Sequence, residues 1–180
     1  MGGTTKDRIL DSEVEMRALQ PADAIAFERA FSEMGWDKPA TQFLQYVLEQ
    51  EAGHRTVLVA EWGGGVAGYV TILWESPDPV FSSRGIPEIS DLNVLLRCRR
   101  KGIGTALMDS AEAIVAKRSS VVGLGVGLHS GYGSAQRLYA RRGYMPDGVG
   151  VVDVDGKAVP EGSEIRLDND VMLRMTKELD

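Results

Sequence analysis

Apolar and polar residues change their spacing several times along the first part of the chain. Val14 to Leu19 alternates apolar and polar residues, which is typical of a half-buried strand. After Pro21, apolar residues recur at helical spacing until Gly35, and they do so again from about Pro39 to Gln50. The pattern therefore predicts a strand followed by two helices.

A strongly apolar stretch in the next part of the sequence predicts a β-hairpin. Thr56 to Trp62 and Val66 to Leu73 are rich in apolar and β-branched residues, and Gly63-Gly64-Gly65 separates them. Glycine runs also occur in phosphate-binding loops, but no lysine followed by serine or threonine comes after this one, and strands flank it on both sides. We expect a turn here and no phosphate site.

The second half of the sequence alternates strand and helix patterns. A proline-rich segment, 76–87, precedes it and is expected to form a loop, either as a plain connection or as the rim of a substrate site. A polar stretch, 156–169, is expected to form a long hairpin loop between the last two strands. The expected elements are strands over 88–94, 121–126, 144–154 and 171–176, and helices over 102–117 and 134–141.

Length and composition predict one domain, residues 1–180. Of the 180 residues, 43% are hydrophobic, which is enough for a sizeable core, and no repeat or linker divides the chain. The net charge of -6 disfavours nucleic acid and membranes as partners, because both attract basic surfaces. The sequence has no apolar run of the roughly 20 residues that a membrane span needs, and no apolar signal segment at its start. We therefore expect a cytoplasmic protein.

Cysteine and histidine are too scarce for a metal centre, so no metal is expected. Cys98 is the only cysteine, and His54 and His129 are the only histidines, which excludes an internal disulfide and a thiolate cluster. A nucleophilic Cys98 would need a histidine partner, and the sequence places none near it. We expect Cys98 to be a small side chain near the surface of an arginine-rich turn.

A cluster of basic residues and glycines follows the strand predicted at 88–94. Arg99, Arg100 and Lys101 come directly before Gly102-Ile103-Gly104, where a helix is expected to begin. The first turn of a helix has free backbone N–H groups and a partial positive charge, and glycines let an anion approach the backbone. The segment is a candidate diphosphate site. The alternative is a basic surface loop before an ordinary helix.

Two other phosphate-binding patterns do not fit these residues. The Rossmann fingerprint needs a third glycine where this chain has Leu107. A P-loop needs lysine and then serine or threonine after its second glycine, where this chain has Thr105-Ala106. A diphosphate site here would belong to another class of protein.

The segment Arg99 to Gly104 resembles the pattern (Gln/Arg)-x-x-Gly-x-(Gly/Ala) of the GNAT N-acetyltransferases. In that family, the strand before the pattern pairs with the pantetheine arm of coenzyme A, and the backbone amides of the turn hold its diphosphate. The resemblance implies acetyl-CoA as co-substrate. It assigns cofactor binding to Leu92, Asn93, Val94, Arg99, Arg100, Lys101, Gly102, Ile103, Gly104 and Thr105.

A second segment, Gly131 to Tyr144, is similar to a later motif of the same family, a short helix with a tyrosine followed by a glycine-aromatic pair. By this resemblance, Tyr139 would lie near the sulfur of coenzyme A and protonate the departing thiolate. A thiol has a pKa of about 8.5 and tyrosine one of about 10, which makes this proton transfer reasonable. Tyr132 departs from the family, where an asparagine that contacts the cofactor is common. Without the first motif, Tyr139 would be interpreted as a core aromatic residue.

Acetyl transfer also needs a base. An alkyl amine with a pKa of about 10.4 is mostly protonated at neutral pH, so a side chain or a chain of waters must remove its proton. Glu88 is the candidate, because counting back from Gly102 places it level with the catalytic glutamate of histone-acetylating relatives. The alternative is a solvated glutamate at the start of a strand. Asp91, as base or as a carboxylate that recognises the acceptor, stays outside the predicted catalytic pair of Glu88 and Tyr139.

The resemblance implies a mixed α/β (α+β) fold with six or seven mostly antiparallel strands, helices on both faces, and a splay between the fourth and fifth strands. Its motifs span residues 88–144. The implied function is direct transfer of an acetyl group from acetyl-CoA to a primary amine in a ternary complex, with the oxyanion held by a backbone N–H near Asn93 or Val94. The alternatives are a non-catalytic regulatory domain that binds acyl-CoA and a generic α/β interaction module. The acceptor, a small molecule or a protein amine, is left open, as is a homodimer, which is common in the family.

Overall fold

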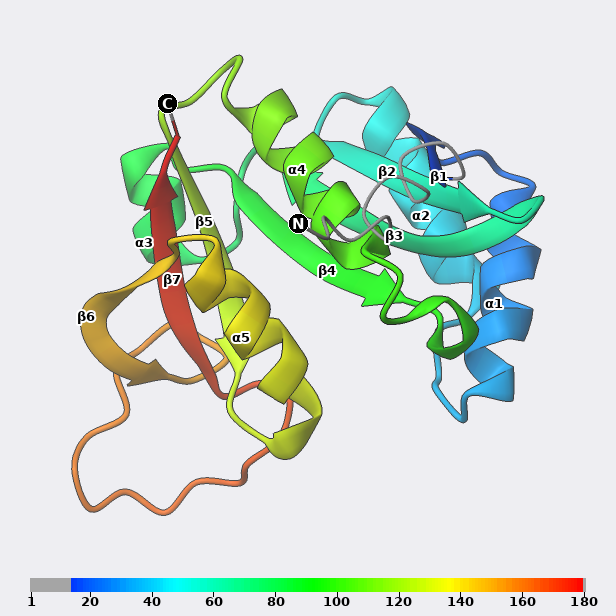
Figure 1. Cartoon of the computed structure of the whole chain (residues 1–180). Helices are drawn as coiled ribbons and strands as arrows, with labels where there is room; N and C mark the ends of the chain where they lie inside the picture. The colour runs from blue at the N-terminus through cyan, green and yellow to red at the C-terminus, as the bar shows by residue number, and fades with distance from the viewer. Residues whose placement is uncertain (1–13, 180) are drawn as a thin grey trace, which may run out of the picture. The chain divides into compact units, whose positions relative to one another are not determined.

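The computed structural model describes residues 14–179 and contains one seven-stranded sheet (Figure 1). The strands are β1 (Val14–Ala18), β2 (Arg55–Trp62), β3 (Gly65–Leu73), β4 (Glu88–Val94), β5 (Val121–Gly127), β6 (Met145–Val152) and β7 (Met172–Glu178). Their order in the sheet is β1-β2-β3-β4-β5-β7-β6. β4 pairs in parallel with β5, where Glu88 lies opposite Gly123, whereas β1 and β2, β5 and β7, and β6 and β7 pair antiparallel. The predicted mixed fold is confirmed.

The helices also lie close to their predicted positions, with one exception. They are α1 (Asp23–Glu33), α2 (Ala40–Glu51), α3 (Pro79–Arg84), α4 (Ile103–Val115) and α5 (Gly133–Arg141), with short 3-10 turns η1 (Leu96–Cys98) and η2 (Ser130–Tyr132). No helix within residues 14–179 is long and apolar enough to cross a membrane.

The exception is α3, which occupies part of the proline-rich segment that was predicted to be a loop. Its start is fixed by Asp78, whose Oδ1 accepts hydrogen bonds from the backbone N–H groups of Val80 and Phe81 at 2.9 and 3.3 Å. Pro79 suits the first helical turn, where its missing N–H costs nothing. Gly85 ends the helix in the left-handed conformation, with φ 61°. The prolines that suggested a loop are thus partly helix start signals.

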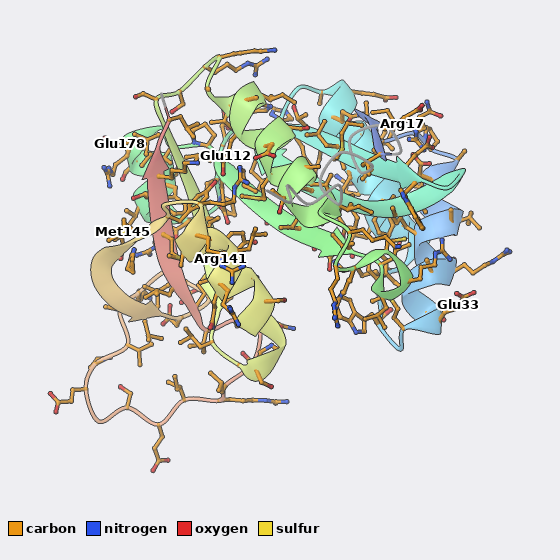
Figure 2. The ribbon with its side chains drawn as sticks, viewed as in Figure 1. Arg17, Glu33, Glu112, Arg141, Met145 and Glu178 are labelled. Carbon is orange, nitrogen blue, oxygen red and sulfur yellow. The ribbon has the colours of Figure 1, made fainter. Side chains whose placement is uncertain are left out.

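The described residues form two compact units, the first from residues 14–72 with Asp91–Ala113, and the second from Leu73–Ser90 with residues 114–179. In the first unit, α1 and α2 pack together and α2 packs on β2. In Figure 1, α4 is drawn in front of the strands of this unit and α2 behind them. Arg17, labelled in Figure 2, connects β1 to α1 through an ion pair with Asp23 at 2.7 Å and to β2 through one with Glu61 at 2.6 Å.

The core of the first unit is aromatic. Phe27, Phe31 and Phe43 project from α1 and α2 and are fully buried. All three rings lie within 6.0 Å of the Tyr69 ring of β3, centre to centre, in edge-on geometry. Aromatic pairs at such distances stabilise a core beyond the area they bury. The cluster therefore fixes both helices against β3.

In the second unit, glycines on β5 let neighbouring side chains pack directly on the strand backbone. A Cβ added at Gly123 would lie 2.6 Å from the Phe81 ring of α3, and one added at Gly125 would lie 2.5 Å from the sulfur of Met172 on β7. Phe81 is almost fully buried, so it has little room to move. Because Gly123 has no side chain, the Phe81 ring of α3 can pack directly on the backbone of β5.

We expect Gly123→Ala to lower the free energy of unfolding by about 1–3 kcal/mol, because the added methyl group overpacks a filled site. Gly65→Ala is the matched control: Gly65 is also a strand glycine, and nothing lies within 4 Å of its added Cβ. Urea denaturation monitored by circular dichroism measures both variants. Equal stabilities of the two variants would show that Phe81 adjusts without cost.

Candidate active site

The end of β4 is held closely against β3. A Cβ at Gly68 would lie only 2.5 Å from the carbonyl oxygen of Asn93, so only glycine permits this approach of the two backbones. Just beyond the strand, the N–H of Leu95 donates to the carbonyl of Ala67 at 2.9 Å. These contacts fix the backbone of the predicted cofactor-binding residues Leu92, Asn93 and Val94.

The turn that follows presents backbone N–H groups at the start of α4. Arg100 and Gly102 both take left-handed backbone conformations, with φ 62° and 79°. Such turns gather successive N–H groups on one side, which favours anion binding. The N–H of Ala106 donates to the carbonyl of Gly102 at 2.9 Å, whereas the first N–H groups of any helix lack an acceptor within it. An anion at this end of α4 would satisfy them.

Three cationic side chains surround the same turn. The Nε of Arg99 donates to the carbonyl of Val94 at 3.1 Å, and the Nζ of Lys101 lies 4.2 Å from the ring centre of Trp62. Arg99 and Arg100 are exposed. Side chains, backbone amides and the helix dipole thus supply positive charge at one place, which fits the diphosphate of coenzyme A.

Cys98, in the middle of this basic segment, does not lie near the surface as predicted. It is buried, with 2% of its surface exposed, and its N–H donates to the carbonyl of Leu95 at 2.8 Å. The neighbouring Arg97 and Arg99 are exposed. The prediction was wrong because the η1 turn directs the arginines outward and the cysteine inward.

Asp91 occupies the centre of a polar cluster in the first unit. Its carboxylate accepts hydrogen bonds from five side chains, which with Asp91 form what we call the Asp91 cluster: Lys38 (2.7 Å), Asn93 (2.8 Å), Tyr69 (2.6 Å), Tyr46 (3.0 Å) and Gln42 (3.2 Å). Lys38 Nζ also donates to the hydroxyl of Tyr69 at 2.9 Å. Asp91 itself has a left-handed backbone, with φ 50°, in the middle of a strand. Strained residues of this kind concentrate at functional sites.

The two tyrosines of the Asp91 cluster are held in their protonated form. Burial raises the pKa of Tyr69 well above its usual value, and the negative charge of Asp91 raises it further. Burial followed by the charge of Asp91 likewise raises the pKa of Tyr46. Both hydroxyls therefore remain hydrogen-bond donors to Asp91 throughout the neutral pH range.

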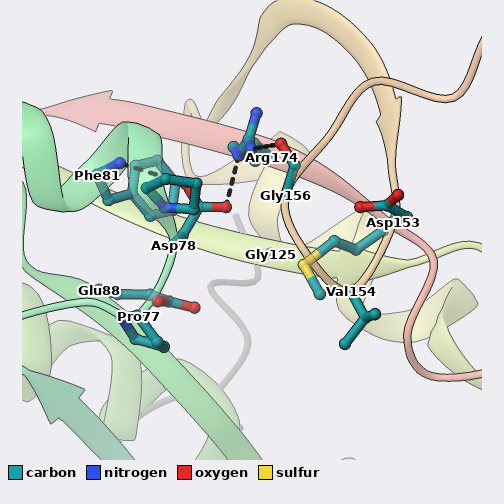
Figure 3. Close-up of a pocket in the computed structure, with 11 residues that line it drawn as sticks. Pro77, Asp78, Phe81, Glu88, Gly125, Asp153, Val154, Gly156 and Arg174 are labelled. Atoms are coloured by element: carbon teal, nitrogen blue, oxygen red, sulfur yellow. Dashed lines mark hydrogen bonds and ion pairs between the residues drawn. The ribbon is translucent and has the colours of Figure 1, made fainter.

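The predicted base, Glu88, lies in the second unit and lines a cavity of about 110 Å³ (Figure 3). Its Oε2 accepts a hydrogen bond of 2.6 Å from the hydroxyl of Ser76, whose oxygen accepts one of 3.0 Å from the N–H of Asp78. The carboxylate of Asp78 and the guanidinium of Arg174 line the same cavity. Glu88 is therefore a half-buried carboxylate positioned by a hydroxyl group.

The predicted proton donor, Tyr139, lies on α5 in the second unit. It is buried, and its ring centre lies 5.8 Å from that of Tyr144. The N–H of Tyr144 donates to the carbonyl of Tyr139 at 3.1 Å, and Nε2 of Gln136 anchors α5 to the carbonyl of Gly127 on β5 at 2.9 Å. The glycine-aromatic pair after α5 thus folds back on the tyrosine.

The cofactor-binding residues predicted from the sequence come together in the first unit, and the predicted catalytic pair lies in the second. Sequence reasoning missed four members of the Asp91 cluster, Lys38, Gln42, Tyr46 and Tyr69. No local pattern marks them, because they contact Asp91 across sequence separations of 22 to 53 residues. Within residues 14–179, no three His, Cys, Asp or Glu side chains are arranged to hold a metal ion.

Comparisons with known proteins place this geometry in a family. A sequence model of the acetyltransferase (GNAT) family matches residues 20–144, whereas no curated protein matches the chain. The solved structures that the fold resembles include the acetyl transferase from Salmonella typhimurium that modifies the N-terminal serine of ribosomal protein L7/L12 (TM-score 0.70, 11% identity, covering 95% of this chain and 98% of that one). They also include an N-acetyltransferase from Staphylococcus aureus Mu50 (TM-score 0.69, 16% identity, covering 93% of this chain and 99% of that one). A third is yncA from Salmonella typhimurium with its cofactor acetyl-CoA (TM-score 0.66, 19% identity, covering 93% of this chain and 95% of that one). Since the family match covers more than half of the sequence, the chain belongs to the GNAT family of acetyltransferases.

Proposed function

We propose that the protein transfers the acetyl group of acetyl-CoA to a primary amine. The observation that carries the proposal is the turn before α4, where two left-handed residues, a helix N-terminus and three cationic side chains meet. When bound, acetyl-CoA supplies the acetyl group as an activated thioester. The backbone of Leu92–Val94 would hold its pantetheine arm, and Arg99–Thr105 its diphosphate.

In the proposed reaction, the amine attacks the thioester directly, without a covalent enzyme intermediate. A bond forms between the amine nitrogen and the acetyl carbon, and the bond from that carbon to sulfur breaks. Glu88 takes the proton that the amine must lose, and Tyr139 gives a proton to the departing sulfur. A backbone N–H near Asn93 or Val94 stabilises the negative oxygen that develops in between.

The acceptor is a small molecule or a protein amine. One structural neighbour modifies the N-terminal serine of a ribosomal protein, but at 11% identity it is similar in fold alone. We further propose a cytoplasmic location, with neither nucleic acid nor membrane as a partner, and a homodimer as the oligomeric state to test. A regulatory domain that binds acyl-CoA without turning it over is the second candidate, and it would need the turn before α4 but not Tyr139.

Replacing both Gly102 and Gly104 by aspartate is expected to weaken acetyl-CoA binding at least about 100-fold, because it removes charge-assisted contacts to the diphosphate and adds two like charges. Isothermal titration calorimetry of the wild type and the variant measures this. The matched control is Gly63→Asp with Gly64→Asp, which makes the same charge change in the β2–β3 turn, where both glycines have positive φ as Gly102 does.

Saturable binding that the control retains and the Gly102/Gly104 variant loses supports the cofactor site. A wild-type protein that binds no acetyl-CoA overturns the proposal and leaves the interaction-module interpretation. Binding without turnover over a broad screen of amines favours the regulatory domain.

A further inference from the structure

The Asp91 cluster already contains one bound primary amine, the side chain of Lys38. Its Nζ lies 2.7 Å from Asp91 Oδ1 and 2.9 Å from the Tyr69 hydroxyl. The rings of Phe31 and Tyr69 lie 5.7 and 5.6 Å from the same nitrogen, close enough for cation–π attraction. A carboxylate, a hydroxyl and two aromatic rings thus surround a single alkylammonium group.

This bound amine lies beside the strand residues to which cofactor binding is assigned. Asp91 directly precedes Leu92, and Asn93 Nδ2 donates to Asp91 Oδ1 at 2.8 Å, the same oxygen that Lys38 contacts. The left-handed backbone of Asp91 lies in the middle of β4. Lys38 Nζ and the side chain of Asn93 therefore share an acceptor next to the proposed path of the pantetheine arm.

The ion pair between Lys38 and Asp91 is not sealed from water. The side chains of Lys38 and Asp91 keep 16% and 19% of their exposure. Solvent can therefore reach the Asp91 carboxylate, and an ammonium group that takes the place of Lys38 exchanges one charge-assisted hydrogen bond for another of the same kind. Lys38 lies in the connection between α1 and α2, outside both helices, so no helical backbone has to move when its side chain leaves the carboxylate.

We propose that the Asp91 cluster is the binding site for the acceptor's ammonium group, and that Lys38 occupies it in the resting protein as an internal mimic of an unbranched alkylammonium acceptor. This inference rests on the proposed acetyl transfer. The acceptor class is then a linear alkyl amine, such as a lysine side chain or a polyamine. Asp91 binds and orients the ammonium group. Its nitrogen loses two protons in the reaction, one to Glu88 before the attack and one afterwards, which makes up the proton that Tyr139 gives to the sulfur.

The test uses Lys38→Ala with n-propylammonium chloride, which replaces the atoms that the substitution removes. In the absence of acetyl-CoA, the probe is expected to raise the thermal midpoint of Lys38→Ala saturably, since a ligand that binds only the folded state stabilises it. The wild type, in which Lys38 competes for the site, is expected to show a smaller rise at the same concentration, and the Lys38→Ala, Asp91→Asn double variant none. Tetramethylammonium chloride at equal concentration controls for ionic strength, because it cannot donate a hydrogen bond.

With acetyl-CoA present, we expect Lys38→Ala to form N-propylacetamide about 10- to 100-fold faster than the wild type, the range that corresponds to one charge-assisted hydrogen bond. Mass spectrometry of the product measures it. Lys157→Ala is the matched control, since Lys157 is also paired with an aspartate, Asp155, but is 75% exposed. If Lys38→Ala does not fold, Lys38→Met with ammonium chloride replaces it in the stabilisation test, because methionine fills the positions of the lysine stem and lacks only the terminal nitrogen.

A Lys38→Ala protein that binds acetyl-CoA as the wild type does, but is not stabilised by propylammonium, overturns this inference and leaves the proposed function standing. Stabilisation without N-propylacetamide also overturns it, because the site would then bind amines away from the reaction. If neither the variant nor the wild type binds acetyl-CoA, it is the proposed function that fails.

Discussion

Tyr139→Phe is expected to lower kcat for acetyl transfer about 10²- to 10⁴-fold, the usual contribution of a positioned proton donor. The substitution keeps the buried ring and its 5.8 Å contact with Tyr144 and removes only the hydroxyl. The thiolate would then leave without its proton, so the loss should appear in kcat and not in the affinity for acetyl-CoA. Release of the coenzyme A thiol, measured with the best amine from a screen, gives the rate.

Tyr144→Phe is the control for this prediction. Tyr144 is also buried in the same unit and also loses one hydroxyl, so it reports the general cost of removing a polar atom from this part of the core. We expect its kcat to stay within a few-fold of the wild type. A comparable fall in both variants would assign Tyr139 a structural role and move the regulatory-domain interpretation forward.

The elements that the sequence predicted well are those whose signals are local. The strand over 88–94 matches β4 residue for residue, and the glycine turn before α4 was found because its charges and glycines are adjacent in the sequence. The missed helix α3 also had local signals, Asp78 as cap and Gly85 as stop, but Pro79 was interpreted as a loop residue instead of a first helical residue.

The Asp91 cluster could not be predicted in the same way. Asp91 was recognised as a candidate carboxylate, but its left-handed backbone was not predicted, because aspartate tolerates this conformation more often than most residues but still adopts it in few cases. Lys38 and Tyr69 reach it only because the aromatic core fixes the position of α1 and α2 against β3. Polar sites assembled by long-range packing require a structure, whereas phosphate-binding turns can be inferred from a sequence.

Arg174→Met is expected to lower the free energy of unfolding by about 3–5 kcal/mol, which is a large part of the usual stability of a domain. The Arg174 side chain is 1% exposed, and its Nε donates to Asp78 at 2.6 Å and its Nη1 to Asp147 at 3.4 Å. Burial lowers its pKa, but the hydrogen bonds and charges of the two aspartates outweigh burial and raise it. Removing this permanent charge leaves two carboxylates largely buried without their counter-ion.

Arg166→Met is the matched control, because Arg166 is 91% exposed and its pairing with Asp168 at 3.6 Å is expected to contribute less than about 1 kcal/mol. Adding Asp78→Asn and Asp147→Asn to Arg174→Met should recover part of the lost stability, since neutral amides cost less to bury than charges. Urea denaturation measures each variant. Asp78 also caps α3, and its N–H donates to the Ser76 hydroxyl that positions Glu88. Arg174 is therefore the buried cation of a chain of polar contacts that runs from β7 to the candidate base. An Arg174→Met protein as stable as Arg166→Met would mean that these contacts stay in place without that cation.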